Sequence, residues 1–414
     1  MTSQIFKGVL TMIFSSSKTF IIQLFLEYKF ENRGLEWLRE KVNQSKIVIT
    51  KADKGGSILI VSPQLMEDIT DRKVSDPSLF KCINHDPRQS LYDKMIDIWK
   101  IGKTKGFVTE VECSEVVGLN NNNNKSTSSW FKPGTTYFCP SLKIHKLREE
   151  DIIPGCIPPA RLVSCLQEGV TKFNDVFIAN KWLKNLENDY CSDLVKDTID
   201  TLRWLDEVDR ECTTVYKTNL KPFSFDFTSL YDSLSPQLVL LAVKHAINQC
   251  RPDWNPEFTE WLLSNIEHSM QSAIGTHKSK WYKPVNGVPT GGSISVPLAN
   301  IAVYYALYNN VYSNDNLMTK IHSMKRFIDD GVGLFNGSIR QFDAWKKEFT
   351  RVLAPYNLLI KPDDWQIATE PGRTIHFLDI EFTFSFKGML LTDIQIKETD
   401  NLMEFRGTIC KVRG

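Results

Sequence analysis

The stretch MKRFIDDGVGLF, from Met324 to Phe335, decides the fold class of this 414-residue chain. Two apolar runs flank Asp329, Asp330 and Gly331, which is the pattern of a β-hairpin with an acidic turn. Asp and Gly favour turns anyway, so two acids at a hairpin tip are often plain turn chemistry. Here the flanking runs are apolar enough for central strands, where adjacent uncompensated anions are costly. The stretch therefore predicts a core hairpin that presents two carboxylates.

A third acid, Asp226, lies in the apolar strand FSFDF about one hundred residues earlier. Alone, it would be interpreted as a satisfied buried acid before the turn at Ser229. Together with Asp329 and Asp330, and with the glycine-rich loop NGVPTGGS (286–293) between them, it indicates a metal site. Mg²⁺ typically binds one or two carboxylates plus substrate phosphates. Two such ions, about 3.5 to 4 Å apart, could support an in-line displacement at phosphorus.

The bulk composition sets wide bounds on the class of protein. A chain with 42% hydrophobic and 24% charged residues can bury a large core, as one lobed domain or as two or three subdomains. Lys and Arg (50) nearly balance Asp and Glu (49), so net charge does not indicate a nucleic-acid binder, although a local basic groove is compatible with it. Nine cysteines, an odd number without a CxxC pair, argue against a zinc site and a disulfide framework and favour a reducing, intracellular setting.

The N-terminal residues 1–45 are apolar and are expected to form a helical extension that packs on the first subdomain. Lys7 and Lys18 interrupt the apolar run before it reaches the ~20 residues that a membrane span needs, so no transmembrane helix is predicted. The run has no acid before Glu27, and an organellar transit peptide is the alternative. Residues 120–129 form a polar low-complexity run and are expected to be a solvent loop.

Between these segments the patterns predict alternating strands and helices. KIVITKADKGGSILIVS (46–62) predicts a hairpin with a basic, glycine-containing tip. Residues 64–119 and 168–212 read as mostly helical, and 137–165 as two extended segments around a charged loop. Ser235-Pro236 should open one helix, and an apolar helix should follow the glycine-rich loop. A final pair of strands is expected in TIHFLDIEFTF and MLLTDIQIK.

Seven of these stretches, in order, resemble the motifs of a reverse transcriptase of the Penelope-like retroelement branch. The resemblance covers roughly residues 46–400, and its parts are ITKADKGGSILIV, PSLKIHK, ARLVS, FSFDFTSLY, GVPTGGSISVPLAN, RFIDD and HFLDIEF. KADKGG and LKIHK favour this branch over retroviral and intron-encoded relatives. One such motif would be weak, whereas seven in register are specific.

The resemblance implies an α+β right-hand polymerase fold in which helices back an antiparallel palm sheet. Residues 46–215 would be the fingers and 216–400 the palm with its catalytic motifs and primer grip. Residues 401–414 would begin a thumb that is truncated or absent, so either a partner supplies thumb or endonuclease function or the chain is a fragment. No GIY-YIG endonuclease motif is found in the chain.

The resemblance also carries roles onto individual residues. Asp226, Asp329 and Asp330, helped by the carbonyl of Phe227, would be catalytic and would bind two Mg²⁺ ions, with Mn²⁺ able to substitute. The residues implied to bind the incoming dNTP are Tyr231, Arg161, Lys143, Gly291 and Gly292. The residues implied to bind nucleic acid are Lys51, Lys54, Lys146, Ser293, Phe377, Leu378 and Asp379. Tyr231 would stack under the sugar and exclude a 2′-hydroxyl, although a core tyrosine at a helix start fits its position as well.

The expected activity is therefore RNA-directed DNA synthesis from a primer, in a retroelement-derived enzyme. Its partners would be an RNA template, a DNA primer and dNTPs, with no membrane, and the family implies a nuclear location. The main alternative is a catalytically inactive or fragmentary reverse-transcriptase-like protein that only binds nucleic acid. An RNA-making polymerase on the same fold is a second alternative, while an unrelated phosphotransferase has no GxxxxGK[ST] loop to support it.

Overall fold

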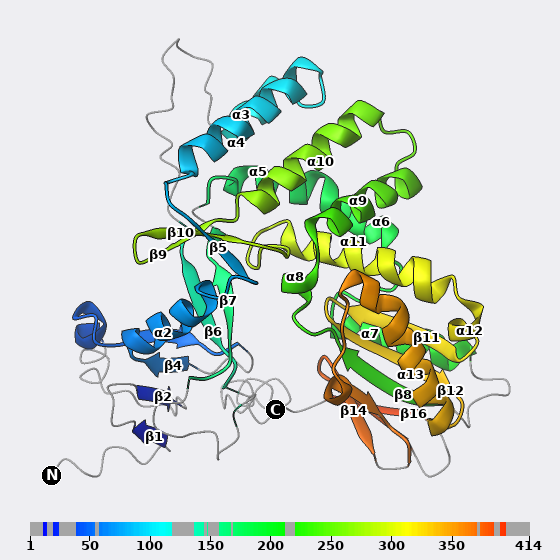
Figure 1. Cartoon of the computed structure of the whole chain (residues 1–414). Helices are drawn as coiled ribbons and strands as arrows, with labels where there is room; N and C mark the ends of the chain where they lie inside the picture. Colours follow the sequence, from blue (N-terminus) through cyan, green and yellow to red (C-terminus); the bar gives the residue numbers. More distant parts are fainter. Residues whose placement is uncertain are drawn as a thin grey trace, which may run out of the picture.

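The computed structural model describes residues 11–14, 20–24, 39–53, 58–117, 136–144, 147, 157–166, 169–211, 220–370, 373–384 and 390–394. The predicted loop at 120–129 and the tail at 401–414 lie outside these residues. Figure 1 shows a sheet-containing part built mostly from strands before residue 165, a layer of helices, and a second sheet-containing part that holds the C-terminal strands.

The strands, in chain order, are β1 (Thr11–Phe14), β2 (Phe20–Leu24), β3 (Val48–Lys51), β4 (Ile58–Val61), β5 (Phe80–Ile83), β6 (Phe138–Leu142), β7 (Ala160–Ser164), β8 (Leu220–Asp226), β9 (Gly275–His277), β10 (Lys280–Pro284), β11 (Ile321–Phe327), β12 (Asp330–Asn336), β13 (Trp365–Ile367), β14 (Thr374–Phe377), β15 (Ile380–Phe384) and β16 (Leu390–Ile394). The helices are α2 (Pro63–Val74), α3 (Arg88–Thr104), α4 (Glu110–Val117), α5 (Lys172–Ile178), α6 (Lys184–Tyr190), α7 (Thr198–Glu211), α8 (Leu230–Ser233), α9 (Pro236–Cys250), α10 (Pro256–Gln271), α11 (Ser295–Leu307), α12 (Asp315–Met318) and α13 (Ile339–Leu353). Ala179–Leu183 and Tyr308–Tyr312 are π-helical turns, and Ala354–Tyr356 and Pro362–Asp364 are short 3₁₀ turns.

The sheet that carries the acidic hairpin is antiparallel and has the strand order β11-β12-β8-β13. The predicted hairpin and the predicted FSFDF strand are thus neighbours, with β8 between β12 and β13. Two glycines of β12 make room for the aromatic side chains of β8. A Cβ on Gly331 would lie 2.1 Å from the Phe225 ring, and one on Gly333 would lie 2.5 Å from the Phe223 ring. Any larger residue at either position would force these rings out of the core.

Both faces of this sheet are covered, which explains why its strands are almost continuously apolar. On one face, α13 packs the rings of Trp345 and Phe349 against β8, with Trp345 5.2 Å from Phe223 and Phe349 5.4 Å from Phe225 between centroids. On the other face, Val332 and Leu334 pack against α7 and the β14-β15-β16 sheet.

The helical layer contains an aromatic cluster at the junction of α3, α5 and α10. Trp99 lies 5.3 Å from Phe177 and 5.5 Å from Trp261, in edge-on arrangements. Gly102 allows the close approach of α3 to α10, because a Cβ there would lie 2.6 Å from the Trp261 ring. Helices predicted across 64–119 and 168–212 are confirmed, as is the helix opened by Ser235, whose hydroxyl accepts from Leu238 N at 3.1 Å.

A buried carboxylate lies in this helical layer. Thr171 Oγ1 donates to Asp175 Oδ2 at 3.0 Å, while neighbouring Asn174 accepts from Trp99 Nε1 and donates to Ser269 Oγ, both at 2.7 Å. No cationic group of the described residues forms an ion pair with Asp175. Desolvation by burial raises the pKa of Asp175 to about 6.

We expect Asp175→Asn to stabilise the protein at neutral pH. The native state holds the Asp175 proton up to a pKa of about 6, whereas the unfolded chain releases it near 3.8, so wild-type stability falls as pH rises through this window. The advantage of the Asn variant should grow from near zero at pH 4 to about 1–3 kcal/mol above pH 6.5. Urea denaturation of both proteins across that range measures it. A variant that is less stable at every pH would contradict this account of Asp175.

The first sheet of the chain has the order β1-β2-β4-β3. The predicted hairpin over 46–62 is confirmed, because β3 and β4 pair antiparallel with Lys51 opposite Ile58. Among the described residues, the helical extension predicted for residues 1–45 is helical at 39–43 but not at 11–14 and 20–24: β1 and β2 pair with each other, and β2 pairs with β4. Apolar runs as short as these do not distinguish a strand from a helix by periodicity.

Two further differences concern small strands. The ribbon formed by β9 and β10, which pairs with β5, was not predicted, because its strands are short and largely polar. The stretch TIHFLDIEFTF was expected to be one strand but contains two, β14 and β15, joined by a turn at Leu378 and Asp379. The two extended segments predicted within 137–165 are confirmed as the antiparallel pair β6 and β7.

Within the described part of the chain, no helix combines the length and the apolar character that a membrane crossing requires. The cysteines at positions 82, 113, 139, 165, 191 and 250 are free thiols.

Candidate active site

The three predicted acids meet at one end of the β11-β12-β8-β13 sheet. Asp330 begins β12 and lies directly opposite Asp226, the last residue of β8. Asp329 precedes it in the turn, where its carbonyl accepts from Phe227 N at 3.0 Å. One carboxylate oxygen from each acid lies within 4.8 Å of the others, and all three residues are half-buried. The pairing of β8 with β12 therefore builds the acid cluster, which we call the acid triad.

The turn that presents the acid triad differs from the predicted one. Gly331 lies inside β12, and the turn consists of Ile328 and Asp329, because Phe327 pairs directly with Asp330. Two-residue hairpins need left-handed backbone, which usually selects Asn or Gly. Here Ile328 adopts it, with φ of 54°. A β-branched residue in this region is strained by roughly 1–3 kcal/mol and must be held by its surroundings.

The donor atoms of the acid triad suit a hard divalent cation. All three ligands are carboxylate oxygens, which Mg²⁺ and Mn²⁺ prefer, and three anions this close in a half-buried place need compensation. Among the described residues, this is the one group of three or more His, Cys, Asp or Glu side chains close enough to share a metal ion. The acid triad is thus consistent with a metal site.

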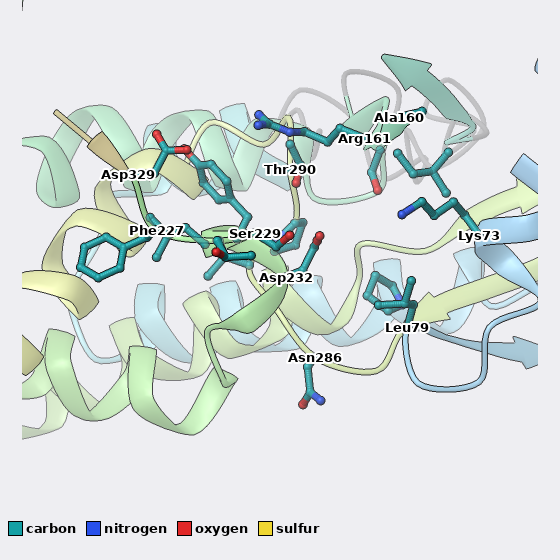
Figure 2. Close-up of a pocket in the computed structure, with 18 of the residues that line it drawn as sticks. Lys73, Leu79, Ala160, Arg161, Phe227, Ser229, Asp232, Asn286, Thr290 and Asp329 are labelled. Atoms are coloured by element: carbon teal, nitrogen blue, oxygen red, sulfur yellow. The ribbon is translucent and has the colours of Figure 1, made fainter. Parts of the chain in front are cut away.

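A cavity of about 210 Å³ adjoins the acid triad (Figure 2). Asp226 and Asp329 form part of one wall, and cationic residues of α2, of the segment after β6, and of β7 line it as well. Figure 2 shows the Arg161 guanidinium extending toward the side where Asp329 lies, while the Lys73 ammonium enters from the opposite side. The charged lining residues are Lys73, Lys143, Arg161, Asp226, Asp232, Asp329, Lys361 and Asp364.

Tyr231 lines this cavity from the short helix α8, as predicted for a residue close to the acids. Burial and the nearby Asp329 carboxylate raise the pKa of Tyr231 to about 12, so the phenol is neutral over the physiological range. The glycine-rich loop packs against its main chain. Val288 N donates to Tyr231 O at 2.7 Å, and a Cβ on Gly287, whose φ is 97°, would lie 2.6 Å from that oxygen.

The same loop is fixed against β7. Ser164 N donates to Thr290 O at 3.2 Å, and Thr290 lines the cavity. Gly291 has a φ of 101°, and a Cβ there would lie 2.7 Å from Ser164 O. Gly292 N donates to Ser295 Oγ at 3.1 Å. Gly291 thus permits a close approach to the main chain of β7, whereas Gly292 packs against the side chains of Ser295 and Leu166.

The β6-β7 pair positions the two predicted cations. Arg161 lies opposite Ser141 in the register, and its Nε is 4.0 Å from Asp53 Oδ1. Ser141 Oγ donates to the same Asp53 oxygen at 3.0 Å. The Asp53 carboxylate is thus fixed beside Arg161 Nε and orients the arginine side chain. Lys143 follows β6, where its N–H donates to Pro159 O at 2.8 Å. Both side chains line the cavity.

Of the predicted nucleic-acid residues, those that the structure describes do not line the cavity. Lys51 is exposed at the end of β3, and Ser293 is exposed in the glycine-rich loop. Lys54 and Lys146 lie outside the described residues. Leu378, with φ of 53°, and Asp379 form the β14-β15 turn, and Asp379 Oδ2 accepts from Thr198 Oγ1 at 3.2 Å. Phe377 is 3% exposed and packs in the core, so that its main chain alone can face a ligand.

Four charged lining residues were not predicted from the sequence: Lys73, Asp232, Lys361 and Asp364. The acids and the lysine of KPDD (361–364) follow an apolar run, and this pattern could have indicated a second acidic turn. Thr228 ties that segment to the acid triad, because its N–H donates to Leu359 O at 2.7 Å and its hydroxyl donates to Asp364 Oδ2 at 3.4 Å. Lys73 and Asp232 carry no comparable signal in the sequence.

The fold resembles that of telomerase. Telomerase structures resemble the chain over most of its length: apo telomerase from Candida tropicalis without its C-terminal domain has a TM-score of 0.55 and 10% identity, over 87% of this chain and 67% of that one. Telomerase from Candida albicans, solved with a TWJ fragment of telomeric RNA, has a TM-score of 0.55 and 12% identity, over 90% of this chain and 57% of that one. At these identities the likeness shows the fold alone.

The chain spans between 53% and 67% of the length of these telomerase chains. No protein-family model matches its sequence, and no curated protein matches it.

Proposed function

We propose that this chain is an RNA-directed DNA polymerase, which extends a DNA primer with dNTPs on an RNA template. The observation that carries the proposal is the acid triad, which forms part of the wall of a cavity that is also lined by cationic residues, on a fold shared with telomerase. The seven ordered motifs support the Penelope-like branch.

In this proposal the fingers comprise residues 46–215 and the palm comprises 216–400, with the β11-β12-β8-β13 sheet as the palm sheet. Asp226, Asp329 and Asp330 hold two Mg²⁺ ions, with the carbonyl of Phe227 as a further ligand. When bound, these ions supply activation of the primer 3′-hydroxyl and stabilisation of the leaving pyrophosphate. The role of the three carboxylates would be to place the ions where the primer end and the triphosphate meet.

The cationic residues of the cavity bind the triphosphate. Arg161, oriented by Asp53, offers planar paired donors, and Lys143 and Lys73 add further positive charge to the cavity wall. Tyr231 lies under the sugar and excludes a 2′-hydroxyl. The main chain around Gly291 and Gly292 places Thr290 beside the nascent base pair. Lys51, Lys54, Lys146, Ser293 and the Phe377–Asp379 turn contact the template and primer strands.

Primer extension on matched RNA and DNA templates tests the proposal. The purified chain should extend a labelled DNA primer on RNA when Mg²⁺ and all four dNTPs are present. Extension that requires rNTPs would instead identify an RNA-making polymerase. No extension with either Mg²⁺ or Mn²⁺, together with retained RNA binding, would contradict the proposal in favour of a protein that only binds nucleic acid.

A further inference from the structure

We propose that Arg326 is a positioning residue, whose buried guanidinium holds the Ile328–Asp329 turn and thereby keeps the acid triad in its metal-binding arrangement. The inference rests on the proposed function only in taking the acid triad as the metal site. Arg326 lies in β11, three residues before Asp329, and is 1% exposed.

The guanidinium contacts the strained turn directly. Arg326 Nη1 donates to the carbonyl oxygen of Ile328 at 2.7 Å. Ile328 is the residue with left-handed backbone, so the bond fixes the peptide group that joins Ile328 to Asp329. A β-branched residue does not hold this conformation by itself. The Arg326 bond therefore supplies part of the restraint that the turn requires.

The other donors of the guanidinium are fixed on parts of the chain remote in sequence. Nε lies 3.2 Å from Asp193 Oδ2, in an ion pair whose side chains are 2% and 3% exposed. Nη1 also donates to Asn300 Oδ1 at 2.9 Å, and Nη2 donates to Asn300 O at 3.2 Å. Asp193 is held in turn by Tyr312, whose hydroxyl donates to Oδ2 at 3.0 Å from a π-helical turn.

The main chain completes this anchor. Arg326 N donates to Asp193 O at 2.8 Å, and Val195 N donates to Arg326 O at 2.9 Å, so that the 193–195 segment extends the edge of β11. Asn300, from α11, also donates through Nδ2 to Glu187 of α6 at 2.5 Å. The turn that carries Asp329 and leads directly into Asp330 is thus tied to α6 and α11.

Charge alone does not explain this arrangement. A lysine at 326 could pair with Asp193, but one ammonium cannot reach Asp193, Asn300 and the Ile328 carbonyl together. A guanidinium that only neutralised Asp193 would leave the acid triad unaffected when that ion pair is preserved. Arg326→Lys therefore separates positioning from charge compensation.

Mn²⁺ binding to the full chain, monitored by electron paramagnetic resonance, tests this inference and does not depend on nucleotide addition. Arg326→Lys should weaken Mn²⁺ binding about tenfold, which corresponds to about 1.4 kcal/mol. Hydrogen exchange should be faster at the amides of Asp329 and Asp330 in this variant.

The matched control is Tyr312→Phe, which removes one hydrogen bond from the same network but leaves the contact with Ile328 intact. It should lower the melting temperature while Mn²⁺ affinity stays within about twofold of wild type.

A rescue variant distinguishes positioning from general loss of structure. Glycine accepts left-handed backbone without strain, so Ile328→Gly in the Arg326→Lys background should restore Mn²⁺ affinity to within about threefold of wild type. If Arg326→Lys does not fold, Asp193→Asn takes its place, because it removes the charge that holds the guanidinium. Its Mn²⁺ affinity should again be lower than that of Tyr312→Phe and should recover with Ile328→Gly. Equal loss of Mn²⁺ affinity in Tyr312→Phe, or no recovery with Ile328→Gly, would overturn the inference.

The proposed polymerase activity can fail independently. A wild-type chain that binds Mn²⁺ at the acid triad but extends no primer would contradict the proposed function, whereas the exchange and rescue results would still decide the role of Arg326.

Discussion

Asp329→Asn is expected to lower the rate of nucleotide addition at least about 10³-fold while leaving the fold intact. Asparagine has nearly the same shape but carries no charge, so one of the three oxygens within 4.8 Å becomes a neutral, weaker ligand. The substitution lies in a half-buried turn and removes repulsion between neighbouring anions, so the melting temperature should stay equal or rise. Single-turnover primer extension and thermal melting of the same preparation measure both effects.

Asp363→Asn is the matched control for this substitution. The substitution makes the same chemical change, from a carboxylate to an amide. Asp363 is exposed and does not line the cavity. Its rate of nucleotide addition should stay within about twofold of wild type, as for surface substitutions in general. Retained activity in Asp329→Asn would remove the acid triad from the catalytic role proposed for it.

Tyr231→Ala should raise the use of rNTPs relative to dNTPs on the order of 10²-fold, through loss of the ring that excludes the 2′-hydroxyl. The main-chain carbonyl of Tyr231 accepts from Val288 N at 2.7 Å in the glycine-rich loop, and its partly buried side chain packs against the core. The ratio of kcat/KM for a ribonucleotide and the matching deoxyribonucleotide, opposite one template base, measures the change.

Tyr231→Phe serves as the control, because it keeps the ring and removes only the hydroxyl. Its sugar selectivity should be close to wild type. Since the pKa of Tyr231 is raised to about 12, the phenol is not ionised between pH 7 and 9, and selectivity should be constant over this range. A Phe variant that accepts rNTPs as readily as the Ala variant would show that the hydroxyl, and not the ring, discriminates.

The sequence predicted the acid triad because its signal is local. An acid at the end of an apolar strand and an acid pair in an apolar hairpin are each visible within a few residues, and strand pairing then places Asp330 opposite Asp226. The exact turn was not predictable. Asp329-Asp330-Gly331 is a good turn sequence, but Gly331 is needed inside β12, where the Phe225 ring occupies the place of a side chain. Packing thus moved the turn to Ile328, against its local preference.

The residues that support the site were less accessible to sequence analysis. From the sequence, Arg326 is indistinguishable from any other residue of a strand. Its partners Asp193 and Asn300 are distant in sequence, and the packing of the helical layer brings them to it. Lys73 reaches the cavity because α2 packs beside β6 and β7. The sequence of α2 contains no pattern that predicts a cavity-lining lysine. The strands β1 and β2 were mistaken for a helix because short apolar runs fit both structures.

The most direct test of template-directed synthesis is single-nucleotide addition on four RNA templates that differ only in the first unpaired base. If the proposed function is correct, the chain adds the complementary dNTP in each case, and the preferred nucleotide changes with the template base. Addition of the same nucleotide on all four templates, or addition that persists without template, would contradict it.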